Sequence, residues 1–474
     1  MRKRITLMFS LLAGSLLFVG CSTVQEEKPF QEVQKETNNR IGKKVEWSRK
    51  TSAGREIQEQ LDDLLDGKLT VNQAVQVALL KNPQLQSRFE ELGITQAELV
   101  EAGVLSNPVF EGAAIYDAGE RVSTSVEVLH NFISVVMLPL REQLAETRKS
   151  KTQLQVTGQI MDLALSVKKT YRKLQAARQK RTLFKRVNQT TGTSYETAQE
   201  LRKAGNITKL DLLQERSLHE KTRLDLAGAN LRVRELRKVL NRKMGVWRHR
   251  SDWRVSSDLP AVPETSISKR ATEKHAIKES LDLDIARKRV RAAAQKEEIA
   301  NVTSVFPFVE AGVEAEQEAD GNWLAGPRLD IPIPLFNQGH PKRSIARSRV
   351  RQAWQTYTKT AIRVRTALRI TRDRVQVHRR RALYYRDVLV PLQKRILNRG
   401  LLRFNGMFIG VFRLLNLKKE EIAIRRQYIN ELLKYWVARA KLKQLLNGRL
   451  VEPSMGASPE PSGTDPGGMG GGGH

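Results

Sequence analysis

The segment Val305-Phe306-Pro307-Phe308-Val309-Glu310-Ala311-Gly312-Val313-Glu314-Ala315-Glu316 alternates apolar and acidic side chains over its second half. Successive side chains of a β-strand point to opposite faces, so this spacing predicts a strand over 305–315. One face is expected to carry Val305, Val309, Ala311, Val313 and Ala315, and the other Glu310, Glu314 and Glu316. The segment 323–333 repeats the pattern, with Trp323, Ala325, Leu329, Ile331 and Ile333 opposite Arg328 and Asp330. The turn-forming residues Ala319-Asp320-Gly321-Asn322 lie between the two segments, which predicts a hairpin.

A second pair of alternating segments lies about 200 residues earlier in the chain. Val109 to Tyr116 is followed by the turn sequence Asp117-Ala118-Gly119-Glu120 and then by Val122 to Val128. Four such strands are typical either of an ordinary half-buried sheet or of a transmembrane barrel. A barrel needs at least eight strands, and lipid tolerates no open strand edges, so in a membrane several copies must share one barrel. Three copies give twelve strands, with Glu310, Glu314, Glu316 and Arg328 as candidates to line the lumen.

Three pairs of similar segments, each pair separated by about 200 residues, indicate an internal duplication. Segment 78–85 matches 276–283, segment 108–111 matches 307–310, and segment 200–205 matches 401–406, at offsets of 198, 199 and 201. Each half is expected to run as a long helix, two short strands, and two long helices separated by a glycine. The first of these helices is expected to begin with a capping box formed by Thr70 and Gln73. Chains of this type are mainly α, with a small β part.

Composition divides the chain into five parts. We expect a signal peptide at 1–20, an extended linker at 21–66, the first repeat at 67–260 with strands near 107–131, the second repeat at 261–450 with strands near 304–335, and a disordered Gly/Pro-rich tail at 451–474. After Pro341 no proline occurs until Pro391 and no glycine until Gly400, which predicts a helix of 45 to 50 residues. Such a helix is roughly 70 Å long.

The charge balance first suggests a nucleic-acid partner. The 474 residues include 82 Lys+Arg and 51 Asp+Glu, a formal charge of +31. The N-terminus argues against this partner, because Arg2, Lys3 and Arg4 precede an apolar stretch that is too short to span a bilayer and reads as an export signal. The stretch runs from Ile5 to Val19, and Gly20 and the only cysteine, Cys21, follow it directly. An exported protein does not meet chromosomal DNA.

Cys21 closes a sequence, Leu17-Phe18-Val19-Gly20-Cys21-Ser22, that resembles a bacterial lipobox. Phe18 departs from the leucine usual at that position. The resemblance implies cleavage before Cys21, acylation of its thiol and new amine, and, with Ser22 next, sorting to the outer membrane. The alternative is a simple anchor with an incidental buried cysteine.

Together these features resemble the TolC family of outer-membrane efflux proteins, in particular the lipoprotein branch that serves resistance-nodulation-division pumps. The residues that carry the resemblance are Leu69-Thr70, Ala74, Ala78, Asn82-Pro83, Leu85, 105–108 and the run 326–336 (Gly-Pro-Arg-Leu-Asp-Ile-Pro-Ile-Pro-Leu-Phe). The resemblance implies a homotrimer with a twelve-stranded outer-membrane barrel and a periplasmic α-barrel of long helical hairpins. It also implies a periplasmic adaptor and an inner-membrane pump as partners, with passive conduction through this subunit.

The resemblance also gives roles to two glycine-containing segments. Gly205, Asn206 and Ile207, and Gly406, Met407 and Phe408, are expected at hairpin tips that contact the adaptor. Six residues after each glycine stand Asp211 and Phe412, the candidates for a periplasmic gate. A ring of three Phe412 side chains would close the pore by dewetting. The alternatives are a helix-start acid stabilised by the helix dipole for Asp211, and packing between helices for Phe412.

Nothing in the sequence points to an enzyme, a cofactor or a metal. The seven histidines have no metal-ligand spacing, and no phosphate-binding, nucleophile-elbow or dinucleotide motif is present. A type I secretion duct is the nearest alternative function, and a periplasmic coiled-coil scaffold or adaptor is a more distant one. The basic excess is concentrated in 341–450, where 29 Lys+Arg face 5 Asp+Glu. This excess is either a solvated face or a surface for anionic peptidoglycan or an acidic adaptor.

Overall fold

The computed structural model describes residues 25, 27–47, 61, 63–65, 67–117, 120–247, 253–255, 258–263, 271–317 and 320–453. The expected signal peptide, Cys21 and nearly all of the expected C-terminal tail lie outside these residues. The expected turn residues 118–119 and 319 also lie outside them.

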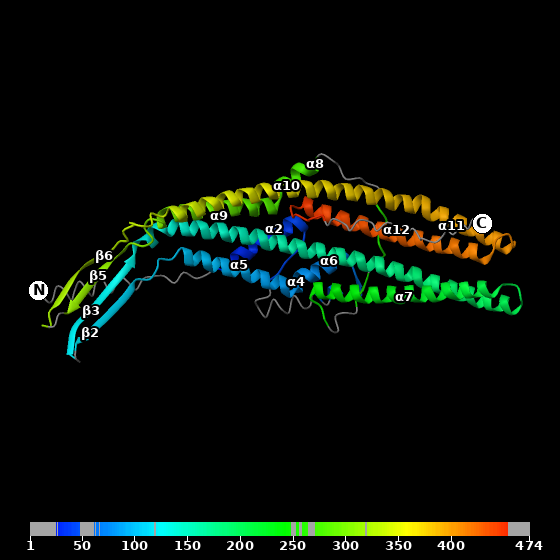
Figure 1. Ribbon diagram of the computed structural model, residues 1–474, viewed down its shortest axis with the longest axis horizontal. Coiled ribbons are helices and arrows are strands. Elements are labelled where there is room, and N and C mark those ends of the chain that lie inside the picture. Colours follow the sequence, from blue (N-terminus) through cyan, green and yellow to red (C-terminus); the bar gives the residue numbers. More distant parts are fainter. Residues whose placement is uncertain are drawn as a thin grey trace, which may run out of the picture. The chain divides into compact units, whose positions relative to one another are not determined.

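Long helices make up most of the described chain (Figure 1). Four of the strands lie next to one another in one sheet. In chain order the elements are α2 (Glu27–Ile41), β1 (Lys68–Leu69), α4 (Val71–Lys81), α5 (Pro83–Ala102), β2 (Val109–Asp117), β3 (Glu120–Asn131), α6 (Phe132–Lys203), α7 (Lys209–Met244), β4 (Arg254–Val255), α8 (Ala271–Lys278), α9 (Leu281–Thr303), β5 (Glu310–Gln317), β6 (Trp323–Asp330), α10 (His340–Tyr384), the π-helical turn η2 (Tyr385–Leu389), α11 (Val390–Asn405) and α12 (Val411–Leu446). This order confirms the mainly α fold with a small β part.

The first helix of each half is broken into two, which the sequence reading missed. Asn82 ends α4 and also caps α5, whose first residue is Pro83, and its side chain accepts a hydrogen bond from the backbone N–H of Leu85 at 3.1 Å. In the second half the corresponding break falls between α8 and α9. Proline disfavours helical backbone in the residue before it, which accounts for the break at Asn82.

The expected capping box at the start of α4 is confirmed. The backbone N–H of Gln73 donates to Thr70 Oγ1 at 3.2 Å, and the backbone N–H of Thr70 donates to Gln73 Oε1 at 2.8 Å. Two helix-terminal donors are thereby satisfied by side chains only three residues away, which is why so local a pattern could be read from sequence.

The expectation of an extended linker over 21–66 is wrong for its middle part, where α2 forms. Phe30 of α2 packs edge-on against Phe89 of α5, with ring centroids 5.0 Å apart, and Trp47 lies 5.6 Å from Phe30. Val33 is fully buried on the same helix. The polar sequence hid this helix because only a narrow apolar stripe is needed when one aromatic contact anchors it.

The four longer strands form one antiparallel sheet in the order β2-β3-β5-β6. The two hairpins come from different halves of the chain, and β3 and β5 join them, with Val128 opposite Val313. A parallel pair, β1 with β4, is separate from this sheet. Strand β5 begins at Glu310, so Val305 and Val309 precede it and do not share its face as expected. The strand face predicted from 311 onward is confirmed.

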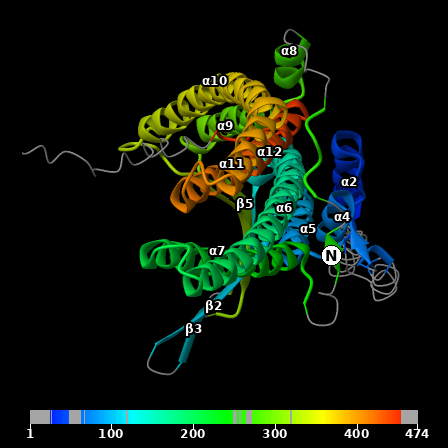
Figure 2. The same cartoon turned by 90° about the vertical axis from the view of Figure 1, so that its right-hand side faces the viewer.

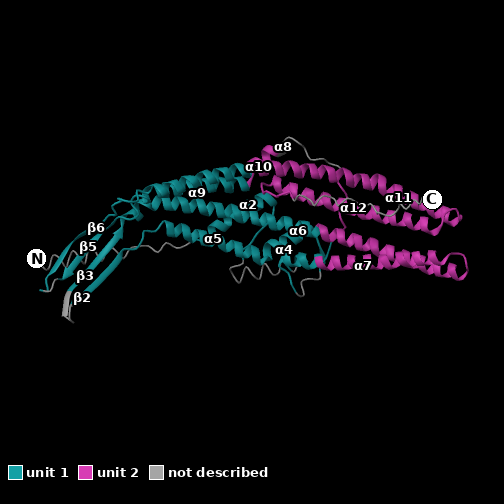
Figure 3. Cartoon of the chain, viewed as in Figure 1, with its two compact units in different colours: residues 1–171, 236–256, 281–360 teal, residues 172–235, 257–280, 361–474 magenta. Residues whose placement is uncertain are grey.

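The chain divides into two compact units that cut across the two repeats (Figure 3). Unit 1 comprises residues 1–171, 236–256 and 281–360, and it includes the four-stranded sheet. Unit 2 comprises residues 172–235, 257–280 and 361–474. Its core contains apolar residues of α10 and α12, among them Leu368, Val375, Leu432 and Leu442.

In unit 2, α11 and α12 lie side by side as a hairpin (Figures 1 and 2). The turn η2 links α10 to α11 just before Pro391, which has no N–H to donate to a helix. Gly400 of α11 faces Leu417, and a Cβ on this glycine would come 2.4 Å from the Leu417 Cδ1 atom. The glycine therefore permits a close approach of the two helices. The uninterrupted 45 residues of α10 confirm the long helix expected after Pro341.

Within unit 1, a buried tyrosine ties the long helix α6 to β1. Tyr171 is 1% exposed, and its hydroxyl donates to the backbone carbonyl of Leu69 at 2.6 Å. Tyr171→Phe leaves that buried carbonyl without this donor and should lower the free energy of unfolding by about 1–2 kcal/mol. Chemical denaturation of the purified protein measures the change. Tyr384→Phe is the matched control, because Tyr384 is 55% exposed. Equal stability of the two variants would contradict the expectation.

Candidate functional site

The sheet has one apolar and one polar face, and the pairing register shows which residues share each. The apolar face carries Phe110, Gly112 and Ala114 of β2, Thr124, Val126, Val128 and His130 of β3, Ala311, Val313, Ala315 and Gln317 of β5, and Trp323, Ala325, Pro327 and Leu329 of β6. Phe110 is 69% exposed and Leu329 61% exposed. An exposed apolar face of this extent marks a surface that another protein or lipid covers.

The opposite face of the sheet is strongly acidic. Its charged residues in the described positions are Glu111, Glu127, Glu310, Glu314, Glu316 and Asp330, with Arg328 as the one cation among them. The structure therefore brings all four sequence-predicted residues, Glu310, Glu314, Glu316 and Arg328, to one face. Sequence analysis did not single out Glu111 and Glu127 as site residues, because the pairing of β3 with β5 was needed to align them with Glu314. Val109, Ile115 and Leu324 are the exposed apolar exceptions, and they lie in the edge strands β2 and β6.

Arg328 holds the acidic face together. Glu111, Glu127 and Glu314 lie directly opposite one another across three strands, an arrangement in which like charges repel. The guanidinium of Arg328 pairs with Glu127, whose side chain is 12% exposed, and reaches Asp330 at 3.3 Å and Glu314 at 4.0 Å. The planar guanidinium has several N–H donors, so it can contact these three carboxylates at once. The single ammonium of a lysine could not do so.

The first hairpin tip, between α6 and α7, closes with a left-handed glycine. Gly205 has φ +76°, and the backbone N–H of Asn206 donates to the carbonyl of Leu201 at 2.9 Å, as in a Schellman motif. Asp211 then caps α7 together with Thr208. The Asp211 carboxylate accepts from the Thr208 backbone N–H at 3.1 Å, and the Asp211 backbone N–H donates to Thr208 Oγ1 at 3.1 Å. Asp211 thus has a capping role within its own chain.

The second tip, between α11 and α12, is closed by a different residue. Met407 has φ +62°, whereas Gly406 has φ −83°, and the backbone N–H of Phe408 donates to the carbonyl of Arg403 at 2.9 Å. A glycine therefore takes the left-handed position at the first tip, Gly205, whereas at the second tip Met407 takes it and Gly406 does not. Met407 is 93% exposed and Phe408 82% exposed. The tip thus presents two exposed apolar side chains, and that of Met407 stands on left-handed backbone.

The left-handed residue of the second tip stands one position after the glycine, and this changes which positions of the two tips correspond. Gly205 matches Met407, and the first residues of α7 and α12 are Lys209 and Val411. Asp211, the third residue of α7, therefore corresponds to Arg413, and Phe412 corresponds to Leu210. Leu210 is 64% exposed and Phe412 is 58% exposed. Both hairpins thus present an exposed apolar side chain at the second position of the returning helix, and sequence spacing alone missed Leu210.

The two tips offer a matched pair of substitutions. Gly205→Ala places a Cβ on left-handed backbone with no atom within 4 Å to clash, so backbone strain alone should cost about 1 kcal/mol. Met407→Gly removes the same strain and should stabilise the second tip, by less, because glycine also gains freedom in the unfolded chain. Thermal unfolding checks both signs. A loss of stability in Met407→Gly would show that its side chain makes a stabilising contact.

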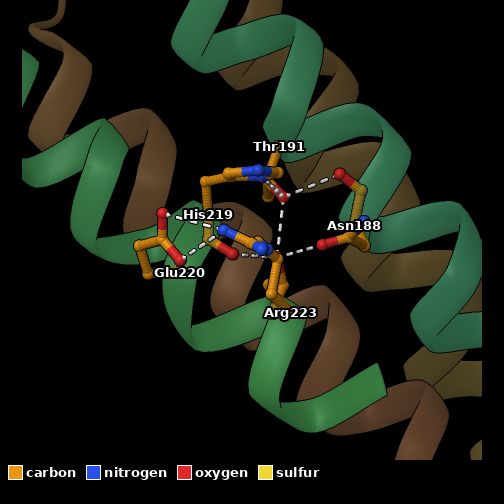
Figure 4. A network of polar contacts seen from close by, with 6 residues as sticks. Asn188, Thr191, His219, Glu220 and Arg223 are labelled. Atoms are coloured by element: carbon orange, nitrogen blue, oxygen red, sulfur yellow. Dashed lines mark hydrogen bonds and ion pairs between the residues drawn. The ribbon is translucent and has the colours of Figure 1, made fainter. Parts of the chain in front are cut away.

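Polar side chains of α6 and α7, here called the polar seam, contact one another about four turns from the first tip (Figure 4). Thr191 of α6 and Thr222 of α7 are 2% and 4% exposed, and their hydroxyls lie 2.8 Å apart. His219 Nδ1 lies 3.4 Å from the Thr191 hydroxyl. On the outer side of α7, Arg223 pairs with Glu220 at 3.0 Å. Because buried polar groups must match partners, this seam fixes the alignment of the two helices and so the position of the tip.

One buried carboxylate lies near the first tip and was missed by sequence analysis. Glu215, one turn beyond Asp211, is 5% exposed. Burial raises its pKa, and nearby Lys418, Ser194 and Lys419 partly offset the rise. Lys418 of α12 also donates to Ser194 of α6 at 3.3 Å. These contacts connect the two hairpins within unit 2, and no local sequence signal marks a contact between residues 194 and 418.

A second buried carboxylate, Glu431, lies between α10 and α12. Burial raises its pKa, but His378 Nδ1 at 2.9 Å and Lys434 Nζ at 2.8 Å outweigh burial and lower the pKa to about 2. The charged form is therefore stabilised at neutral pH.

The described residues contain no group of three His, Cys, Asp or Glu side chains placed to hold a metal ion. Across the same residues, every helix is too polar or too short to cross a lipid bilayer.

Comparison of the sequence with protein-family models and with curated proteins finds no match. Solved structures are similar in fold. The CmeC outer membrane channel of Campylobacter jejuni aligns with 88% of this chain and 92% of its own, at 14% identity and a TM-score of 0.68. The outer membrane protein VceC of Vibrio cholerae aligns with 80% of this chain and 97% of its own, at 15% identity and a TM-score of 0.66. The MtrE outer membrane channel of Neisseria gonorrhoeae aligns with 80% of this chain and 89% of its own, at 15% identity and a TM-score of 0.65. This chain has the fold of these outer-membrane proteins over nearly their whole length, the TolC-like fold that its sequence resembles.

Proposed function

We propose that three copies of this chain form an outer-membrane channel, a homotrimer in which each copy gives four strands to one twelve-stranded barrel. The sheet supports this proposal most directly. Within the described residues it is open at β2 and β6, and its exposed apolar face lies opposite an acidic one. Lipid tolerates no unpaired strand edges, so edges of neighbouring copies must pair. The acidic face, with Glu310, Glu314, Glu316 and Arg328, then lines the lumen.

In this proposal the long helices build a periplasmic conduit, and their tips meet other proteins. Gly205, Asn206 and Ile207, and Gly406, Met407 and Phe408, contact a periplasmic adaptor, and an inner-membrane pump supplies the energy. Conduction through this subunit is passive, as in an efflux system. Acylated Cys21 anchors the chain in outer-membrane lipid, and the basic helices face peptidoglycan or an acidic adaptor. Two helical hairpins and a four-stranded sheet favour this channel over an adaptor, for which one hairpin is expected.

Planar bilayers test the proposal. The purified full-length protein should insert and give discrete conductance steps, and cell fractionation should place heat-resistant trimers in the outer membrane. Soluble monomers released from the periplasm by osmotic shock, with no conductance steps, would overturn the channel assignment.

Asp211 allows a sharper test of the gate. Thr208→Ala and Asp211→Ala both break the capping box and should each cost about 1 kcal/mol of stability. Only Asp211→Ala also removes a carboxylate from the periplasmic entrance. If Asp211 forms part of a charged gate, reversal potentials in a salt gradient change in Asp211→Ala and stay unchanged in Thr208→Ala. The same potential in both variants would leave Asp211 with its capping role alone.

A further inference from the structure

A basic groove lies in unit 1 between α6, α9 and α10. Its volume is about 560 Å³. Five cations line it, namely Lys151 of α6, Arg289 and Lys296 of α9, and Lys342 and Arg349 of α10. Small and apolar residues, Ala292, Ala293, Ile299, Ala300, Ile345 and Ala346, form the rest of its wall together with Thr303. No acidic side chain lines the groove in the part of the chain that the structure describes.

The cations of the groove crowd one another without carboxylate partners. Burial lowers the pKa of Lys151, and Arg289, Arg148 and Lys296 lower it further, against a single opposing influence from Glu98. Burial likewise lowers the pKa of Lys296, and the nearby charges of Arg148 and Arg349 lower it further. By contrast, cations of the same helices outside the groove do find acids, since Arg287 pairs with Asp284 and Arg347 with Glu297. Within the described chain, none of the five cations that line the groove forms an ion pair with a carboxylate.

The groove lies next to the base of the sheet. Thr303 is the last residue of α9, and β5 begins at Glu310. Lys342 stands in the first turn of α10, which follows β6, and its Nζ donates to both the carbonyl and the Oγ1 of Thr303 at 3.0 Å. The alanines leave space between the charged side chains, and the charges come from three different helices. Such an arrangement can surround a compact anion on several sides.

We propose that this groove is a binding site for a phosphate group, held by Lys151, Arg289, Lys296 and Arg349. Lysine and arginine together provide charge and several donors, which suits a phosphate with its multiple acceptor oxygens. Two sources offer this chemistry, the headgroup of an anionic phospholipid and free inorganic phosphate. The location favours the headgroup, an argument that rests on the proposed function, because a sheet spanning the outer membrane puts the end of the groove at Thr303 and Lys342 beside the inner leaflet.

The experiment compares two double variants of the full-length protein in non-ionic detergent. Lys296→Gln with Arg349→Gln removes two cations of the groove. Arg291→Gln with Arg351→Gln removes two exposed cations of the same helices outside it, and serves as the charge-matched control. Isothermal titration uses three probes, which are short-chain phosphatidylglycerol, short-chain phosphatidylcholine and inorganic phosphate. Circular dichroism confirms that each variant is folded.

The expected result is saturable binding of phosphatidylglycerol at one site per chain, weakened at least about ten-fold by the groove variant and unchanged by the control. Equal affinity for inorganic phosphate, lost in the same variant, would keep the phosphate site and make the free ion its source. Equal losses in both variants would show a general surface-charge effect and overturn the proposal, as would binding of no anionic probe. Wild-type protein that binds the lipid but gives no conductance steps would contradict the channel assignment alone.

Discussion

Replacing Phe412 by alanine is expected to raise the single-channel conductance of the reconstituted protein several-fold. Phe412 is 58% exposed in the chain, so packing between helices of the same chain does not account for it. In the proposed trimer, three copies of this side chain face one another at the periplasmic end. A ring of apolar side chains closes a pore by excluding water, and shortening each member to a methyl group lets water and ions return.

Leu210 extends this prediction to the other hairpin. It corresponds to Phe412 in the aligned tips, so Leu210→Ala should also raise conductance, and the double variant should exceed either single one. Leu224→Ala is the control, since Leu224 is 75% exposed on the same helix but lies about 20 Å further along it. Unchanged conductance in both Phe412→Ala and Leu210→Ala would contradict an apolar gate and favour a gate formed by other residues.

Arg328→Gln is expected to destabilise the assembled barrel and to make it more selective for cations. The substitution leaves Glu127, with a 12% exposed side chain, directly opposite Glu314 without the cation that pairs with both. A carboxylate that is largely shielded from water loses stability when its cation partner is removed, so the melting temperature of the trimer should fall. The melting temperature of the trimer and its reversal potential in a salt gradient measure the two effects.

Two companion variants separate charge from geometry. Arg328→Lys keeps the charge but loses the planar fork, so it should fall between wild type and Arg328→Gln in stability. Glu316→Gln removes a carboxylate of the same face outside the Arg328 contacts, and should reduce cation selectivity without loss of stability. If Arg328→Gln melted at the wild-type temperature, the pairing with Glu127 would have no structural importance.

The sequence predicted those features whose cause is local. The Thr70–Gln73 capping box, the alternation along β5 and β6, and the long helix after Pro341 each depend on residues within a few positions of one another. Features with distant causes were beyond it. The pairing of β3 with β5 aligns Glu127 with Glu314 across almost 190 residues, and α2 depends on the contact of Phe30 with Phe89.

The hairpin tips show why site residues are harder to predict than elements. A glycine in a turn sequence invites the assumption of left-handed backbone, and at Gly205 that assumption is correct. At the second tip Met407 takes the left-handed position next to an available glycine, and no composition rule marks such a residue. Counting from the two glycines matches Asp211 with Phe412, whereas counting from the two left-handed residues matches Asp211 with Arg413. Register along a helix must therefore be established before two halves of a duplicated chain are compared.

Cross-linking of strand edges between copies tests the central claim most directly. Ala113 of β2 and Gly326 of β6 lie on the acidic face, and a Cβ on Gly326 meets no atom within 4 Å. The double variant Ala113→Cys with Gly326→Cys, treated in outer-membrane fractions with a short bismaleimide, should give covalent species up to three chains and no larger. Each single variant should remain monomeric on denaturing gels. Products that stop at two chains or continue beyond three, or the absence of any cross-link, would contradict a barrel closed by three copies.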